Sequence, residues 1–104
     1  MADLVLSDDE GFGYVLRWYS EQCDGDWEHE FGIRLESLDN PGWNLRIDIG
    51  GTDLEGVLLA WFRRDYEVGR WMMAYSDGVV FEANCDPSSL YLAVDEFKRL
   101  VDTR

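Results

Sequence analysis

The residues best able to do chemistry lie in one short acidic segment of the first third of the chain. Asp24, Asp26 and Glu28 alternate there as carboxylates do at the start of a calcium-binding loop. The rest of that loop pattern is absent, because the glycine required at its sixth position is His29 and the glutamate required at its twelfth is Leu35. We therefore predict no metal site, and we interpret Asp24 or Asp26 as an acceptor for the backbone N–H groups of a turn.

The same segment holds the single histidine of the chain, His29, close in sequence to Cys23. A thiol and an imidazole can form a nucleophile and base pair, but nothing in this spacing enforces the necessary geometry. The sequence also has no Gly-x-Ser-x-Gly elbow, no Gly-Lys-Ser/Thr phosphate loop and no paired-histidine motif. We predict that the protein is not an enzyme, with no catalytic residues and no cofactor. A small ligand- or metal-binding domain that uses the Asp24–Glu30 turn stays open as the alternative function.

Trp27 stands among these carboxylates and fits no apolar period. Tryptophan is enriched at the energetic centres of protein interfaces, so an exposed Trp27 surrounded by acids would make a contact patch. The other interpretation is that its indole packs as a lid on the core. The partner-binding residues that we predict are Asp24, Asp26, Trp27, Glu28 and Glu30.

The charge of the chain narrows the class of partner. Its 104 residues include 22 acidic and 9 basic ones, which gives a formal net charge of −13. A field of this sign repels nucleic-acid phosphates and anionic lipid, and it speeds encounters with basic proteins. We predict a basic protein partner, no nucleic acid and no membrane, although solubility alone also accounts for an acidic surface.

Targeting signals and cysteine usage indicate the compartment. The first ten residues lack the basic region and apolar run of a secretory signal, and no later stretch is long and apolar enough to span a membrane. Cys23 and Cys85 match no metal-ligand or redox spacing, so we expect two free thiols. These features predict a cytoplasmic protein.

The elements that must position the acidic segment begin with a helix. The length of the chain and its 46% hydrophobic residues suffice for one core, so we predict a single domain over residues 1–104. Ser7 or Asp8 can cap a helix over about residues 9–22. Apolar residues at helical spacing predict one buried face, made of Phe12, Val15, Leu16, Tyr19 and Cys23.

A β-hairpin follows, because the apolar period changes from helical to two. Phe31, Ile33 and Leu35 alternate with polar residues, and Trp43, Leu45, Ile47 and Ile49 do the same in the next run. A three-residue loop of Asn40-Pro41-Gly42 would place Gly42 in a left-handed position and oppose Leu35 to Ile47 and Ile33 to Ile49. We expect any other residue at position 42 to cost stability.

Three further strands and a second helix complete the predicted fold. Residues 57–66 are apolar on both faces and indicate a strand covered on two sides. Residues 71–75 and 79–85 flank a glycine turn, and we place Trp71, Met73, Tyr75, Val79 and Phe81 on one face. Asp86 as N-cap and Pro87 at the first position predict a helix with Leu90, Val94, Phe97 and Val101 buried. The result is an α+β fold with an N-terminal helix, a five-stranded antiparallel meander sheet and a C-terminal helix.

The chain resembles the immunity protein 53 family of bacterial polymorphic-toxin systems. The resemblance lies in Trp18-Tyr19, in Cys23 to His29, in Gly32-Ile33, in Leu38 to Trp43 and in Ile47-Asp48, with weaker likeness in residues 52–54 and 90–97. It implies a small α+β cytoplasmic immunity protein that binds and neutralises a cognate toxin, with a nuclease as one class of target. It implies no catalytic residue and assigns no individual toxin contact.

Overall fold

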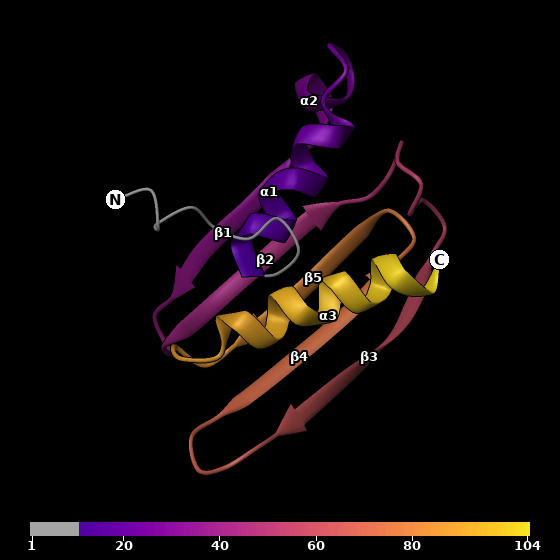
Figure 1. Ribbon diagram of the computed structural model, residues 1–104. Helices are drawn as coiled ribbons and strands as arrows, with labels where there is room; N and C mark the ends of the chain where they lie inside the picture. Colours follow the sequence, from indigo (N-terminus) through magenta and orange to yellow (C-terminus); the bar gives the residue numbers. More distant parts are fainter. Residues whose placement is uncertain (1–10) are drawn as a thin grey trace.

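The computed structural model describes residues 11–104, so the predicted helix cap at Ser7 or Asp8 lies outside the described residues. Three helices and five strands follow one another along the chain: α1 (Gly11–Gln22), α2 (Trp27–Glu30), β1 (Ile33–Leu38), β2 (Gly42–Asp48), β3 (Leu58–Asp65), β4 (Trp71–Asp77), β5 (Val80–Cys85) and α3 (Leu90–Thr103). All paired strands are antiparallel (Figure 1). The predicted α+β class, with a helix at each end of a five-stranded antiparallel sheet, is confirmed.

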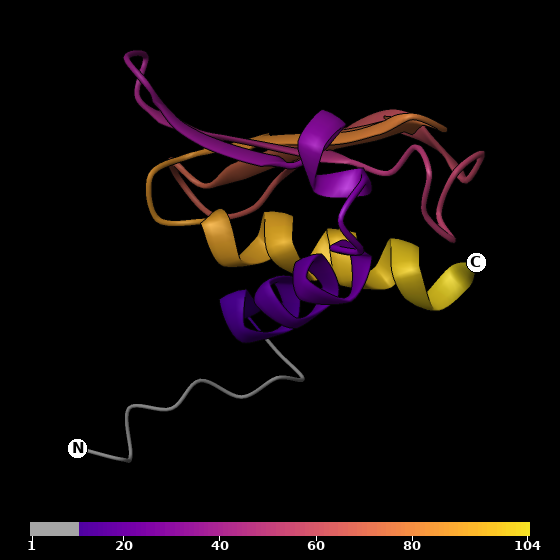
Figure 2. The same ribbon diagram turned by 90° about the horizontal axis from the view of Figure 1, so that it is seen from above.

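Both longer helices, α1 and α3, lie on the same face of the sheet (Figure 2). The helices and the sheet enclose a core in which α3 contributes Val94 and Phe97 and the sheet contributes Leu45, Ile47 and Phe81. No helix between residues 11 and 104 covers the other face.

The predicted meander is wrong, because the strand order is β1-β2-β5-β4-β3. Strand β5 lies between β2 and β4, with Leu45 of β2 opposite Ala83 of β5. These two strands carry side chains with almost no exposure on the helix side, including Ile47 and Phe81. The centre of a sheet buries such residues best, since helices cover it and strands flank it on both sides. The connection after β2 therefore crosses to the far edge before β3 begins.

Strand β3 was predicted to be covered on two sides, and this is wrong. It forms an edge of the sheet, with Leu58 72% exposed and Trp61 61% exposed. Its pairing with β4 shifts register between Leu59 and Phe62. An irregularity of this kind twists an edge and discourages nonspecific pairing, which lets an apolar strand remain at the surface.

The β1–β2 hairpin has the predicted faces but a different register. Ile33 pairs with Ile47 and Leu35 pairs with Leu45, so the pairing is offset by two residues from the prediction. A shift of two keeps every side chain on its face, because the period of a strand is two. The loop is Asp39-Asn40-Pro41, and Gly42 begins β2 with extended backbone opposite Leu38 instead of taking a left-handed turn position.

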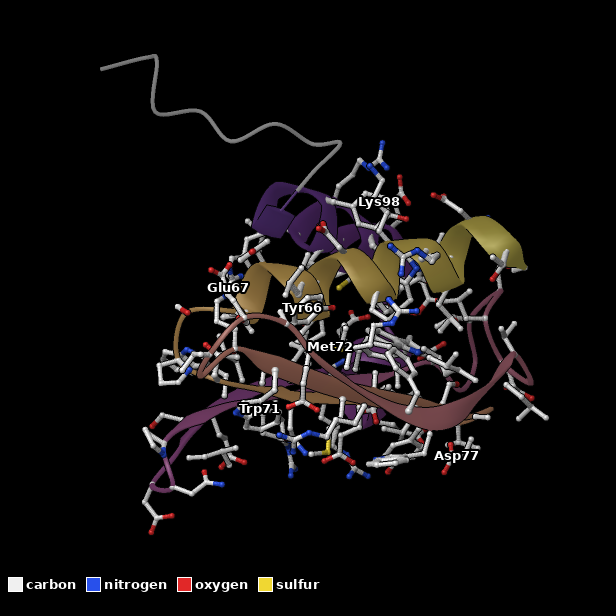
Figure 3. The ribbon with its side chains drawn as sticks, turned by 90° about the horizontal axis from the view of Figure 1, so that it is seen from below. Tyr66, Glu67, Trp71, Met72, Asp77 and Lys98 are labelled. Carbon is white, nitrogen blue, oxygen red and sulfur yellow. The ribbon has the colours of Figure 1, made fainter. Side chains whose placement is uncertain are left out.

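The predicted faces of β4 are also wrong. Met72, Ala74 and Ser76 are buried, and the odd-numbered residues of this strand point away from the helices. Figure 3 shows Met72 on the helix side of the sheet and Trp71 on the opposite side. The cause is the length of the turn between β4 and β5. Ser76 pairs with Phe81, and opposed residues of an antiparallel pair lie on the same face. An even-numbered position in β4 therefore shares a face with an odd-numbered position in β5.

Helix α1 is rotated relative to the predicted face. Tyr14, Val15 and Trp18 are buried, whereas Phe12 is 40% and Leu16 is 58% exposed. The rings of Trp18 and Phe97 meet edge to face at a centroid distance of 5.0 Å, which turns α1 towards α3. No strand of residues 11–104 lies beyond β1, so no described strand covers the side of α1 that faces this edge.

The buried residues of α3 include Val94, Phe97 and Val101, as predicted, but the predicted N-cap is wrong. The helix begins at Leu90, and Asp86 lies buried in the turn before it. The Asp86 carboxylate accepts hydrogen bonds from the Trp71 N–H at 2.8 Å and from the Ser88 N–H at 3.0 Å and hydroxyl at 2.8 Å. It therefore joins the start of β4 to the turn that leads into α3.

We expect Asp86→Asn to reduce the free energy of unfolding by about 1.5–3 kcal/mol, because the neutral amide lacks the charge that strengthens the hydrogen bonds from Trp71 and Ser88. Burial would raise the pKa of Asp86, but hydrogen bonds from Ser89, Trp71 and Ser88 outweigh it and hold the pKa well below its usual range. A lowered folded-state pKa gives stability that is present above the unfolded-state pKa and lost as pH falls through the folded one. Urea titrations from pH 7 to pH 2 should show a shallower acid loss in the variant. Equal slopes would contradict this role.

We expect Gly42→Ala to reduce the free energy of unfolding by about 1–3 kcal/mol, since crowding in a packed site forces backbone shifts. A Cβ at Gly42 would collide with the backbone carbonyl oxygen of Cys85 in the neighbouring strand. Gly32→Ala is the matched control, because a Cβ there meets no atom within 4 Å and the backbone has no positive φ. Urea unfolding compares the two, and equal losses would show that the collision is not the cause.

Candidate functional site

The acidic segment folds into a turn that leads into the single-turn helix α2, and two of its carboxylates hold that turn together. One carboxylate oxygen of Asp24 accepts the N–H groups of Asp26 at 2.9 Å and Trp27 at 3.0 Å. Glu28 returns the interaction by accepting the N–H groups of Asp24 at 3.0 Å and Gly25 at 2.8 Å. The prediction that Asp24 or Asp26 accepts backbone N–H groups of the turn is confirmed for Asp24, and Glu28 takes the same role without having been predicted.

The same hydrogen bonds explain the acidity of both carboxyl groups. Bonds from the backbone N–H groups of Trp27 and Asp26 lower the pKa of Asp24. Bonds from the N–H groups of Glu28 itself, Asp24 and Gly25 lower the pKa of Glu28. Both groups are therefore ionised at neutral pH, and they keep a negative charge at this end of the molecule.

Trp27 is buried, with 6% of its surface exposed, so its indole is not available as an exposed contact residue. Its Nε1–H donates to the Gly50 carbonyl at 2.9 Å. Its ring meets those of Trp18 at 6.0 Å, Tyr19 at 5.9 Å and Phe31 at 5.9 Å. Of the two interpretations of Trp27, the structure supports the lid on the core.

The remaining predicted contact residues, Asp26 and Glu30, are exposed. Glu55 joins them from the loop after β2, because it accepts the Gly51 N–H at 2.7 Å and Gly51 lies against Trp27. We call the carboxylates gathered here the acidic end: Asp24, Asp26, Glu30 and Glu55, which are exposed, and Glu28, which is half-buried. Within residues 11–104, none of the five forms an ion pair with an arginine or lysine. Their charge is therefore directed to solvent or to a partner.

The acidic end does not gather into a metal site in the described part of the chain. Residues 11–104 contain no group of three or more histidine, cysteine or acidic side chains that could hold an ion. The Cys23 thiol donates to the Tyr19 carbonyl at 3.3 Å, while His29 lines a polar hollow of about 350 Å³ with Glu30, Arg34, Arg46 and Asp48. The structure therefore does not bring His29 and Cys23 together as a base and nucleophile pair.

A second surface feature lies beside the acidic end and was missed by sequence reasoning. An apolar groove of about 390 Å³ separates α1 from the first two strands. It is lined by Phe12, Val15, Leu16, Tyr19, Gly32, Ile33, Leu35 and Leu45. Sequence periodicity places most of these apolar residues on predicted buried faces. It cannot show that α1 and β1 leave a groove between them.

The sequence is similar to one described protein family. The pattern of the family described as Immunity protein 53 matches residues 13–102. The chain belongs to the immunity protein 53 family. No curated protein and no solved structure matches the chain. The family indicates toxin neutralisation in general, implies binding to a cognate toxin, and is generally non-enzymatic. Among the described residues, no helix has the length and apolar character needed to cross a membrane.

Because the chain belongs to an immunity family, the acidic end and the apolar groove are both to be considered as surfaces for a toxin. Four of the five predicted contact residues are accessible to a toxin, and Trp27 supports them from within. The arrangement has no group that could hold a metal ion between residues 11 and 104, and it offers negative charge next to an apolar groove. Such a combination suits protein recognition.

We expect Trp27→Phe to lower the free energy of unfolding by about 1–3 kcal/mol, because the Gly50 carbonyl loses its buried donor. Toxin affinity measured well below the unfolding midpoint should stay within about twofold of the wild type, since the indole is buried. Chemical unfolding and calorimetry measure the two effects. A large loss of affinity in a fully folded variant would restore Trp27 as a contact residue.

Proposed function

We propose that this protein neutralises a basic cognate toxin in the cytoplasm, and that the acidic end is the surface that attracts it. The observation that carries the proposal is the set of five carboxylates that lack ion pairs in the described part of the chain. The formal net charge of −13 adds a long-range field of the same sign.

The geometry of the turn supports rapid association. Backbone hydrogen bonds fix Asp24 and Glu28, so little conformational freedom is lost when a cation approaches them. Asp26 and Glu30 are exposed beside them and are free to pair with basic side chains. A toxin that acts on nucleic acid would suit this surface, because phosphate binding requires a basic substrate surface that carboxylates can cover.

The general role is tested by co-expression with the toxin encoded beside this gene. Growth should be rescued, and the two chains should purify together. Failure of both would contradict the proposed function.

We expect Asp26→Asn combined with Glu30→Gln to slow association with the toxin about threefold to tenfold at about 0.05 M salt, because steering charges act on the on-rate. The difference should shrink by about 0.5 M salt, where the Debye length falls to about 4 Å. Stopped-flow or surface-based kinetics measures both conditions.

The matched control is Asp95→Asn combined with Asp102→Asn, which changes the net charge equally at exposed positions on α3. This control should alter the on-rate much less than the variant at the acidic end. Equal slowing by the two pairs would show that net charge, and not the acidic end, steers the toxin.

A further inference from the structure

Among residues 11–104, strand β1 pairs with β2 alone and forms an edge of the sheet, so its outward hydrogen-bonding groups pair with no described strand. The Asp48 N–H donates to the Gly32 carbonyl at 3.0 Å, so these opposed residues lie at a hydrogen-bonding position of the ladder, although the Gly32 N–H donates to the Asp48 carboxylate at 2.9 Å. Bonded and non-bonded pairs alternate along an antiparallel ladder, so Arg34 and Glu36 also bond to β2. The residues that alternate with these bonded positions are Ile33, Leu35 and Ser37. Their backbone N–H and C=O groups therefore point outwards, away from β2.

The apolar groove lies beside this same edge. Its outer wall comes from α1, where Phe12 is 40% and Leu16 is 58% exposed, and its floor includes Leu35, which is 43% exposed. Ile33 and Leu35 pair with the buried residues Ile47 and Leu45, so their side chains face the helix side of the sheet. The groove is therefore where a sixth strand would place its alternate side chains.

We propose that an extended segment of the toxin adds to the sheet at β1 and inserts alternate apolar side chains into the groove under α1. This inference rests on the proposed function and names the surface that the toxin occupies. Backbone hydrogen bonds to the outward groups of β1 would supply affinity, and the groove would select the side chains.

Charge favours a toxin segment over a second copy of this chain. The groove reaches Gly32 and Ile33, which also line the hollow that contains Glu30 and Asp48, so its end adjoins the acidic end. A basic residue that flanks the inserted strand would meet carboxylates there. Arg34 and Arg46 also line the hollow and would repel a basic residue inside it, so that residue would reach Glu30 from the solvent side. A second copy would instead bring another formal charge of −13 to the same place.

Hydrogen exchange on the complex with the toxin encoded beside this gene tests the proposal. The amide protons of Ile33, Leu35 and Ser37 should exchange at least about tenfold more slowly in the complex than in the free chain, because they acquire partners only there. Those of Arg34 and Glu36 should change less, since they already bond to β2. A complex in which the three outward amides remain unprotected would overturn the proposal.

Two substitutions test the groove. Leu16→Gln and Leu35→Thr alter exposed side chains, and each should raise the Kd of the complex about tenfold. Leu58→Thr is the matched control, because Leu58 is an exposed leucine on the opposite edge strand, β3, and it should leave the Kd within about twofold. Circular dichroism checks that each variant is folded.

The outcomes separate this inference from the proposed function. Growth rescue and complex formation together with unchanged Kd values for both groove variants would overturn the inference and leave the proposed function standing. Absence of rescue and of a complex would overturn both. A free chain that is dimeric, with the outward β1 amides already protected, would assign the edge to a second copy and overturn the inference.

Discussion

Burial of the Trp27 indole is the interaction on which the arrangement of this molecule depends. Its N–H is bound to the Gly50 carbonyl, and its ring contacts aromatic residues from α1 and from the segment before β1. One side chain therefore fixes the end of α1, the turn, the start of the sheet and the loop after β2. The carboxylates beside it are held in place because the indole cannot move without breaking a buried hydrogen bond. The acidic end is thus a rigid surface built over a core residue.

The placement of both long helices on one face determines which surfaces remain for a partner. Helix α1 turns its buried residues towards α3 and Trp27, and this leaves Phe12 and Leu16 without a covering element in the described part of the chain. A sheet of five strands has two edges, and the edge at β1 lies beside an apolar groove and the acidic end. Fixed charge, apolar surface and free backbone groups thus occur together at one corner of the fold. Each contributes differently to recognition, through encounter rate, affinity and register.

Several features could be predicted from local pattern alone. The helices, the strands and the apolar positions of α3 follow from periodicities of 3.6 and two, which depend only on neighbouring residues. Recognition of Asp24 as a turn acceptor was possible for the same reason, since its partners lie within three positions. The failed predictions concern turn lengths, a helix cap and the packing of elements that are distant in sequence. The face of β4 depends on how many residues its turn contains, and the position of β3 at an edge depends on β5 pairing with β2.

The sequence by itself determined an acidic α+β protein whose local elements and family resemblance point to toxin immunity, because composition, periodicity and short-range hydrogen bonding are properties of the chain. Only the tertiary structure decided that Trp27 is a core residue and that Phe12, Leu16 and Leu35 are at the surface. Exposure is set by which elements pack together. The sequence periodicity around an apolar residue is the same whether a neighbouring strand covers that residue or the sheet ends beside it. The groove at β1 is therefore a consequence of strand order and of the rotation of α1.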